Sequence, residues 1–448
     1  MESARSGGVT AGVRADTTLV SRTCEVPDVS YRAFLAAQPV PRIHWSAPDG
    51  LEIAGGGAAA RLVAEGPGRF EALREDAAAL FSDLDVDGPH AARPRLVGGA
   101  AFNERHADAP PWAGFPAALF VLPRVQLVRT DETTYLTVSA FDPEEGPGEV
   151  AASLEAIRER IADLPAMAPR GVAPGVRATH HRTPEAEWKA QVRAAADRIA
   201  DGELEKVVLA LALAVDLEEP VDAPSVLERL RRTYPECYRF LVQPTEAAAF
   251  FGAPPERLVA LDGREVRTEA LAGSVARGDT PEEDADLAAS LLESEKLQHE
   301  QRLVVDAICE QLDPLGEVRE GDQGVHRLAT IQHLRTPIEA TLSGEGHVLD
   351  IVEALHPTPA VGGLPPDTAW DVIRETETFE RGWYAAPLGW FDADGNGEFA
   401  VAIRSGVAGD RSATLFAGNG IVGDSDPDAE WEEVQLKYRP VLDELRRR

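Results

Sequence analysis

Short apolar runs, separated by glycine and proline turns, fill the chain from residue 43 to residue 139. Runs of this length between turn residues are typical of β-strands. We therefore expect strands within residues 117–128 and 134–139, paired with each other. The first 30 or so residues show no periodicity, and we expect a loosely held lead-in or an edge strand there.

Later segments combine continuous apolar runs with the helical period. Residues 204–215, LEKVVLALALAV, predict a buried strand. Further strands are expected around residues 239–252, 257–266 and 415–422, with a turn at 424–428. Apolar residues at helical spacing predict helices over residues 148–164, 184–201, 293–312 and 429–446. Residues 165–174, PAMAPRGVAP, predict a linker.

The composition limits the possible classes of function. The 448 residues include 76 Asp and Glu against 44 Lys and Arg, a formal net charge of -32. Such a field repels nucleic-acid backbones and anionic membrane surfaces, so we expect neither as a partner. Because 44% of the residues are hydrophobic, the chain can bury a large core, which excludes global disorder. The length suits two or three ordinary domains, or one unusually large one.

The first residues and the cysteines predict a soluble, cytoplasmic protein. Residues 1–10 lack the apolar stretch of a signal peptide, and the longest apolar runs, such as 207–215, are too short to span a membrane. Cys24, Cys237 and Cys309 lie far apart and show no metal-ligand spacing, so we expect three reduced thiols.

Acidic residues extend from residue 2 to residue 444, while only four lysines accompany 40 arginines. Two interpretations of this bias stay open. One is an ordinary solvated surface in a protein from a GC-rich genome. The other is a halophilic surface, adapted to salt concentrations at which screening removes the repulsion between carboxylates.

Lys206 is unusual because this lysine-poor chain places it just inside an apolar strand. It can be a strand-edge lysine that extends its ammonium group to water. It can also be a general base, a role that arginine cannot fill because the guanidinium group does not deprotonate in proteins.

Carboxylates on two predicted helices form a second candidate site. Glu295 and Glu300 lie on one helix, and on the last helix Glu430 and Glu433 share a face with Lys437 one turn further on. Carboxylates facing each other across two helices suit Mg²⁺, which prefers oxygen ligands. Ordinary solvated acidic side chains remain the alternative, since such residues occur throughout the chain.

Three weaker signals lie in the second half. The segment 417–420, AGNG, follows an apolar strand and can bring backbone amides close to an anion, although a tight turn explains it equally well. His333 and His356 are by default structural histidines. We find no phosphate-binding lysine loop, dinucleotide fingerprint or nucleophile elbow in a suitable context.

Together, several segments resemble the chorismate-utilising enzymes, specifically the isochorismate synthases. They occur in the family's order between about residues 180 and 446: EKVVLA (205–210), FGAPPERLV (251–259), EALAGSVARG (269–278), SEKLQHE (294–300), IQHLRTP (331–337), LHPTPAVGGLP (355–365), RGWYAAPLGW (381–390), VAIRSG (401–406), LFAGNGIV (415–422) and AEWEEVQLKY (429–438). Residues 176–448 are thus expected to form a chorismate-binding catalytic region. Residues 1–175, a less diagnostic part, are expected to belong to the same domain.

The resemblance implies a single large α+β domain in which two antiparallel sheets pack face to face, with helices outside. It implies a Mg²⁺-dependent isomerase that converts chorismate to isochorismate, for menaquinone or siderophore biosynthesis. Water attacks C2 of chorismate in this reaction, and the C4 hydroxyl leaves. Chorismate is then the small-molecule partner, and we expect a monomer or a weak dimer.

The resemblance also assigns roles to individual residues. Lys206 matches the base that activates water, and Glu256 matches the acid that protonates the leaving hydroxyl. Glu300 and Glu433 match the Mg²⁺ ligands, and Glu430 matches a neighbour that binds the metal through water or supports its ligands. The remaining matches contact or approach the substrate: Gly273 and Ser274 at the ring carboxylate, Tyr384, Arg404, Gly418 and Gly420 at the enolpyruvyl carboxylate, and His333 and Lys437 nearby.

Three alternative functions can be weighed against these residues. Relatives that form anthranilate or aminodeoxychorismate lack a lysine at the position of Lys206, so its presence favours water as the nucleophile. Salicylate synthases share the lysine but carry threonine at the position of Ala360, so Ala360 favours a reaction that stops at isochorismate. A chorismate-binding sensor without activity would need a damaged site, whereas the base, acid and metal positions all hold competent residues.

Overall fold

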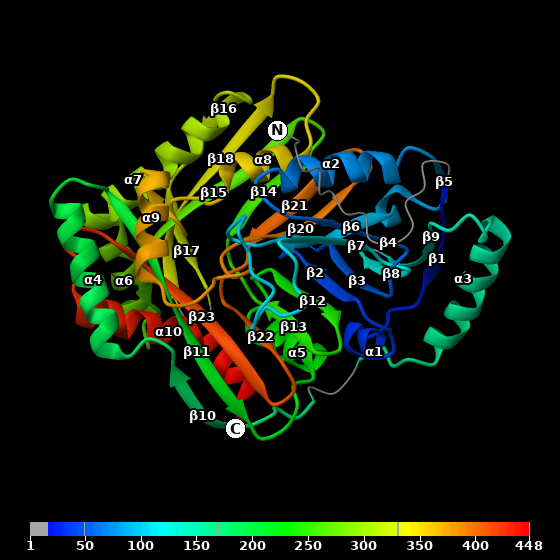
Figure 1. Ribbon diagram of the computed structural model, residues 1–448, viewed down its shortest axis with the longest axis horizontal. Helices are drawn as coiled ribbons and strands as arrows, with labels where there is room; N and C mark the ends of the chain where they lie inside the picture. Colours follow the sequence, from blue (N-terminus) through cyan, green and yellow to red (C-terminus); the bar gives the residue numbers. More distant parts are fainter. Residues whose placement is uncertain (1–16, 49, 132, 168–170, 329–330, 448) are drawn as a thin grey trace, which may run out of the picture.

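A computed structural model describes residues 17–48, 50–131, 133–167, 171–328 and 331–447 (Figure 1). In this part of the chain, two large and mostly antiparallel sheets and ten α-helices form one domain of the α+β class. The fold expected from the sequence is therefore confirmed. No helix among the described residues is long and apolar enough to cross a membrane.

The larger sheet, sheet A, contains thirteen strands within the described residues. Its spatial order is β10 (Val176–His181), β11 (Lys206–Leu217), β23 (Ser412–Ile421), β22 (Ser405–Ala408), β13 (Ala248–Gly252), β12 (Arg239–Thr245), β2 (Arg42–Ser46), β3 (Glu52–Gly56), β8 (Val125–Arg129), β9 (Thr134–Ala140), β1 (Leu19–Val26) and β5 (Leu84–Asp87). The short strand β19 (Gly363–Leu364) pairs with the start of β11.

Sheet B has ten strands in the same described ranges. Its order is β16 (Gly316–Glu320), β18 (Ile331–Leu342), β15 (Glu265–Ala276), β14 (Arg257–Asp262), β21 (Gly397–Val401), β20 (Pro387–Asp392), β6 (Arg95–Ala100), β7 (Ala118–Leu122) and β4 (Ala60–Ala64). Strand β17 (Gly324–Arg327) pairs with β18.

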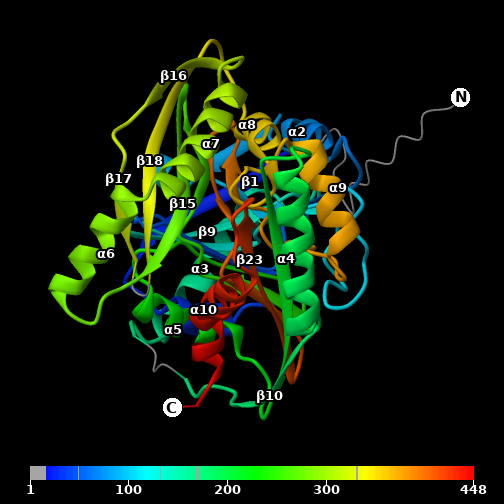
Figure 2. The same cartoon turned by 90° about the vertical axis from the view of Figure 1, so that its left-hand side faces the viewer.

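The helices lie on the outside of the two sheets (Figures 1 and 2). They are α1 (Tyr31–Ala36), α2 (Arg69–Leu80), α3 (Pro147–Ala162), α4 (Glu185–Ala200), α5 (Ala223–Thr233), α6 (Pro281–Glu293), α7 (Glu295–Leu312), α8 (Val348–Leu355), α9 (Pro366–Thr376) and α10 (Pro427–Leu445), with one 3-10 turn at His90–Ala92. Helices α4, α9 and α10 contact β11 or β23, and α7 contacts β15 and β18.

A first core joins the facing sides of the two sheets. It includes Trp45 and Phe250 from sheet A and Phe120 and Phe399 from sheet B, each fully buried. Large apolar side chains on both inner faces remove water from the space between the sheets, which is the main stabilisation of such a packing.

A second core lies between the outer face of sheet A and its helices. Successive residues of a strand point to opposite faces, and β11 shows this directly. Leu209 and Leu211 belong to the helix-side core, whereas Ala210 and Ala212 belong to the core between the sheets. Lys206 shares the inward parity of these alanines, so this alternation points it away from the helix-side core.

Several predicted elements are confirmed with small shifts at their ends. The predicted strand at 204–215 is β11, and the predicted helices at 148–164, 184–201, 293–312 and 429–446 are α3, α4, α7 and α10. The predicted linker at 165–174 has no helix or strand in its described residues. The strand expected at 415–422 is the last part of β23.

Three strand predictions need correction. The run 117–128 forms two strands in different sheets, because the chain leaves sheet B at Pro123, which has no N–H to donate, and enters sheet A. Its second half, β8, does pair with β9 as expected. The runs 239–252 and 257–266 each contain a two-residue turn and supply two strands, and at Gly263 the φ of +60° suits a turn.

The N-terminal expectation also needs correction. Residues 1–16 lie outside the described part of the chain. Strand β1, which follows them, is not at the edge of sheet A, since it pairs with β9 on one side and with β5 on the other. Strand β5 forms the edge instead.

Candidate active site

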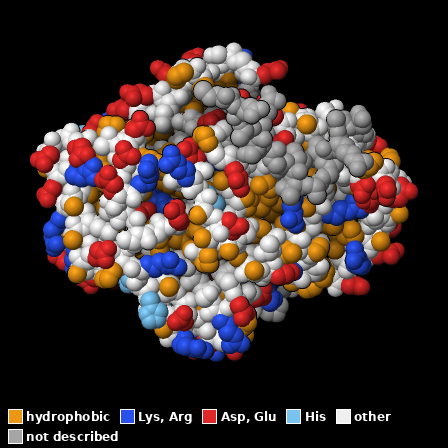
Figure 3. All heavy atoms as spheres, in the orientation of Figure 1, with side chains coloured by type: hydrophobic (Ala, Val, Ile, Leu, Met, Phe, Trp, Pro, Cys, Tyr) orange, Lys and Arg blue, Asp and Glu red, His pale blue; other side chains and the backbone are white. Residues whose placement is uncertain are grey.

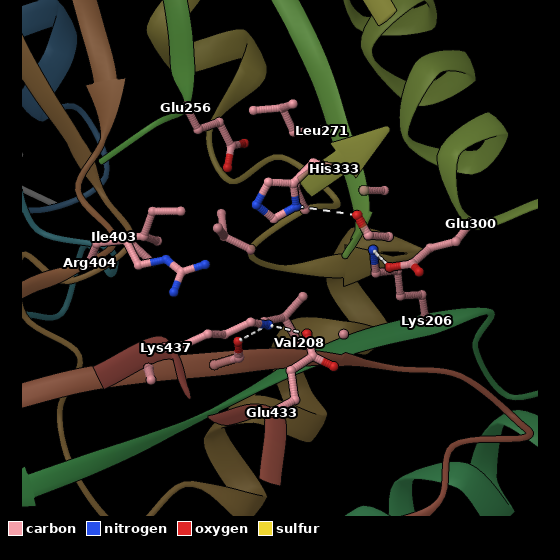
Figure 4. Close-up of a pocket in the computed structure, with 18 of the residues that line it drawn as sticks. Lys206, Val208, Glu256, Leu271, Glu300, His333, Ile403, Arg404, Glu433 and Lys437 are labelled. Carbon is pink, nitrogen blue, oxygen red and sulfur yellow. Dashed lines mark hydrogen bonds and ion pairs between the residues drawn. The ribbon is translucent and has the colours of Figure 1, made fainter. Parts of the chain in front are cut away.

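One cavity collects the predicted site residues. It lies where β11 and β23 of sheet A face β15 and β18 of sheet B, with α7 and α10 beside them (Figure 4). The predicted residues that line it are Lys206, Glu256, Gly273, Glu300, His333, Ala360, Tyr384, Arg404, Gly418, Gly420, Glu430, Glu433 and Lys437. The backbone of Ser274 pairs with His333, but its side chain lies outside the described part of the structure.

Lys206 is the first residue of β11 and is only 2% exposed. Its Nζ donates a hydrogen bond of 2.8 Å to Oε1 of Glu300 on α7. Gly420 leaves the room for this pair, because a Cβ there would lie 2.8 Å from Cε of Lys206 and 3.2 Å from Oε1 of Glu300. A larger residue at this position of β23 would force the end of the Lys206 side chain to shift.

Glu256 lies just before β14, in the sheet opposite Lys206. The side chain is 6% exposed. Burial, together with the charge of Glu269, raises the pKa of Glu256 to about 8, despite an opposing effect of Lys206. At neutral pH this carboxyl group therefore holds a proton, as a general acid must. Figure 4 places Glu256 and Lys206 on different sides of the open centre of the cavity.

Helix α10 brings Lys437 and two carboxylates to the cavity. Nζ of Lys437 donates to Gly418 O at 2.9 Å and Asn419 Oδ1 at 2.8 Å, and pairs with Oε1 of Glu433 at 2.9 Å. Nδ2 of Asn419 in turn donates to Oε2 of Glu430. Burial and the neighbouring charge of Glu433 raise the pKa of Glu430. These contacts hold α10 against β23 and fix its polar face.

His333 is neutral in this environment. Burial, with the charges of Arg404 and Lys437, lowers its pKa to about 3. Nδ1 donates to the carbonyl oxygen of Gly273 at 3.2 Å, which leaves Nε2 as an acceptor. Nε2 is buried and has no partner among the described residues. The ring can thus accept a hydrogen bond from a molecule in the cavity.

Arg404 and Ala385, which line the cavity, have an unfavourable backbone conformation. They are the two non-glycine residues of the described chain with positive φ, at 52° and 58°. Such conformations are uncommon for residues with a side chain and often mark functional sites. Arg404 is 8% exposed, and its guanidinium group points toward the cavity in Figure 4. Tyr384 stacks on Phe416, and burial raises the pKa of its hydroxyl well above the usual value.

The structure adds two cations that the motif match did not assign. Lys296 of α7 lines the cavity and pairs with Asp424 at 3.1 Å. Arg381 is 4% exposed, pairs with Glu377, and donates to the carbonyl oxygens of Val361 and Val208 in the cavity wall. The scarcity of lysine is the signal for Lys296, since three of the four lysines in the sequence line this one cavity.

The carboxylates have the right chemistry for Mg²⁺ but are not gathered around one point. The described residues contain no group of three His, Cys, Asp or Glu side chains placed to hold a metal ion. Glu300 and Glu433 are each paired with a lysine. The donor type nevertheless fits, because three carboxylates from two helices line one cavity. A cation there would also relieve the repulsion between Glu430 and Glu433.

A protonated carboxyl group, a buried lysine and further cations around one cavity define an acid–base enzyme for a small anionic substrate. The comparison with known families agrees with this class. A model of the chorismate binding enzyme family matches residues 9–446, and the chain belongs to this family.

Individual relatives are similar over most of their length. The salicylate biosynthesis isochorismate synthase of Pseudomonas aeruginosa is 39% identical over 90% of this chain and 85% of its own. The isochorismate synthase MenF of Bacillus subtilis is 37% identical over 79% of this chain and 74% of its own. The solved structure of MenF, the menaquinone-specific isochorismate synthase of Escherichia coli, superposes with a TM-score of 0.82 at 28% identity, and covers 98% of this chain and 97% of that one.

Proposed function

We propose that this protein is an isochorismate synthase, which converts chorismate to isochorismate by attack of water at C2 and loss of the C4 hydroxyl. The observation that carries the proposal is that one cavity holds Lys206 on one side and Glu256, with its raised pKa, on another (Figure 4). The names of the relatives above support the same reaction.

The two residues account for the proton transfers. Water is a weak nucleophile and hydroxide is a poor leaving group, so the displacement needs a base on one side and an acid on the other. In this mechanism Nζ of Lys206 accepts a proton from the attacking water as the C2–O bond forms. Glu256 gives its proton to the oxygen on C4 as the C4–O bond breaks, and the C4 hydroxyl leaves as water. Proton exchange with solvent then restores both residues.

The remaining cavity residues bind the substrate's charges. Chorismate is a dianion, and the protein has a net charge of -32, so binding depends on local cations. Arg404 and Tyr384 would hold the enolpyruvyl carboxylate, with Gly418 and Gly420 leaving space for its approach. Lys437 of α10, whose Nζ donates to the carbonyl oxygen of Gly418 on β23, adds positive charge on the same side.

Glu300 and Glu433 would hold Mg²⁺, with Glu430 beside them. The ion would neutralise the ring carboxylate, next to Gly273 and Ser274. For this role Glu300 must exchange its contact with Lys206 for the metal. The carboxylate of Glu433 must likewise turn from Lys437.

Two observations support the narrower details. Ala360 lines the cavity at the position where salicylate synthases have threonine, which favours release of isochorismate over elimination of pyruvate. The three cysteines are free thiols, as in proteins of the reducing cytoplasm, where we propose that the enzyme acts. We propose a monomer or a weak dimer as the active form.

The direct test is to incubate the protein with chorismate and Mg²⁺ and to identify the product by ¹H NMR. Isochorismate as the sole product supports the proposal. Salicylate and pyruvate would assign a salicylate synthase, and an aminated product in the presence of ammonia would assign an amine-forming relative. If the protein binds chorismate but leaves it unchanged, it would be assigned as a sensor.

A further inference from the structure

A second cavity lies on the outer face of sheet A, between α1 and α5. Both helices are labelled in the lower half of Figure 1. It shares no described lining residue with the active-site cavity. Its walls include residues of six elements: the strands β2, β3, β8 and β12 and the helices α1 and α5. Five arginines line it: Arg32, Arg129, Arg231, Arg232 and Arg239.

The carboxylates around this cavity neutralise some of these charges. Glu52 contacts Arg129 at 2.8 Å and His44 at 3.0 Å, and Glu228 is shared between Arg231 and Arg232. Arg129 also contacts Asp28, and Arg32 contacts Asp222 at the rim. One carboxylate serving two exposed arginines leaves each of them with donors for a further acceptor.

Arg239 is the exception on the cavity wall. It is 7% exposed and makes no direct ion pair with a carboxylate in the described ranges, although the charge of Glu52 acts on it from nearby. It donates to the carbonyl oxygens of Pro235 and Cys237 and to Oγ of Ser46, while its Nε has no described partner. A buried cation that no carboxylate contacts directly is only partly compensated, so an anion in the cavity would be stabilised there.

His44 adds a second unsatisfied group. It is 4% exposed, its Nε2 contacts Glu52, and its Nδ1 has no partner among the described residues. Leu35 of α1 and Leu227 of α5 form an apolar part of the same wall. The cavity thus combines charged donors with apolar surface, the usual make-up of a small-molecule site.

We propose that this second cavity binds a small organic anion, with its carboxylate or phosphate group at Arg239, Arg231 and Arg232 and its apolar body against Leu35 and Leu227. A guanidinium group matches both kinds of oxyanion in the same fork geometry. The site is independent of the proposed reaction, because it does not use the catalytic residues.

The test uses the full-length Arg404→Gln variant, which removes one of the cations that line the active-site cavity, and two probes with the same apolar body. Binding of benzoate and of phenyl phosphate is measured by titration calorimetry at constant ionic strength, with benzyl alcohol as the neutral control. We expect saturable binding of at least one anion and none of the alcohol. The tighter probe identifies the preferred head group.

Two further variants are made in the Arg404→Gln background: Arg239→Gln alone, and Arg231→Gln together with Arg232→Gln. Each should weaken this binding by about tenfold or more, the effect of a lost hydrogen bond to a charged group. The exposed Arg319→Gln, on β16, is the matched control and should change nothing. If Arg239→Gln fails to fold, the exposed double variant still decides. Absence of saturable binding, equal binding of the alcohol, or binding unaffected by all these substitutions would overturn the proposal.

Discussion

At the scale of single residues, Lys206 bears the greatest part of the proposed chemistry. Lys206→Gln keeps a polar end but removes the group that takes a proton from water. Isochorismate formation should fall by ~10²-fold or more, the lower range for a lost general base. Substrate affinity should change less, since Arg404 and Lys437 bind the carboxylates. Lys189→Gln, a lysine paired with Glu185 and Asp428 on the outside, should retain full activity. Near-normal turnover by Lys206→Gln would place water activation elsewhere.

Glu256 gives the reaction a defined pH dependence. Its pKa of about 8 means that the acid form is filled below that pH and empties above it. The initial rate should therefore decline as the pH rises through about 8, and Glu256→Gln should be strongly impaired at every pH. A wild-type rate that stays constant between roughly pH 7 and 10 would show that another group protonates the leaving hydroxyl.

Many residues of the site could be predicted from the sequence, but their contacts and backbone conformations could not. A rare lysine in an apolar strand singles out Lys206, and the rarity of lysine alone draws attention to Lys296 on α7. The contact of Lys206 with Glu300 joins residues 94 positions apart. No pattern in the neighbouring sequence marks the positive φ of Arg404.

At the scale of elements, α7 and α10 each bring a carboxylate to the proposed metal site. Glu300→Gln and Glu433→Gln replace a charged oxygen ligand with a weaker amide oxygen. Each should raise the Mg²⁺ concentration needed for half-maximal activity and weaken Mg²⁺ binding measured by calorimetry. Glu295→Gln, on the exposed first turn of α7, is the control and should leave both unchanged. Unchanged metal binding in both site variants would refute the ligand assignment.

The elements themselves show where sequence periodicity succeeds. Long helices such as α4 and α7, and the continuous apolar strand β11, were predictable because burial on one face or both dictates their composition. Where an apolar run contains a tight turn, the sequence pattern did not show that the run forms two strands, as it does in β12 and β13. At Pro123 the chain passes from one sheet to the other, and an apolar run does not reveal which sheet each half joins.

At the scale of the whole molecule, the order of strands in the sheets is the least predictable feature. Strand β2 pairs with β12, about two hundred residues further along the chain. Residues 1–175 and 176–448 both supply strands to sheet A and to sheet B. Such long-range pairing depends on matching surfaces across the molecule. The family resemblance anticipated two sheets packed face to face, but not the order of their strands.

The charge of the whole molecule makes a prediction of its own. Acidic side chains are spread over the visible face in Figure 3, in keeping with the net charge of -32. If the surface is adapted to salt, the melting temperature should rise from low salt to molar KCl, because the Debye length shrinks from about 10 Å at 0.1 M to about 3 Å at 1 M. A flat or falling curve, measured by calorimetry, would leave the acidic composition with another cause.

The central claim is that a water molecule, activated at Lys206, becomes the C2 hydroxyl of the product, while the C4 hydroxyl takes a proton from Glu256 and leaves as water. The most direct measurement is the reaction in ¹⁸O-labelled water with Mg²⁺, stopped early and analysed by mass spectrometry and ¹³C NMR. The account predicts isochorismate with one ¹⁸O atom, located at C2, and residual chorismate that is unlabelled at the earliest times. Unlabelled isochorismate would mean that the original hydroxyl group migrates within the substrate, and would contradict the account.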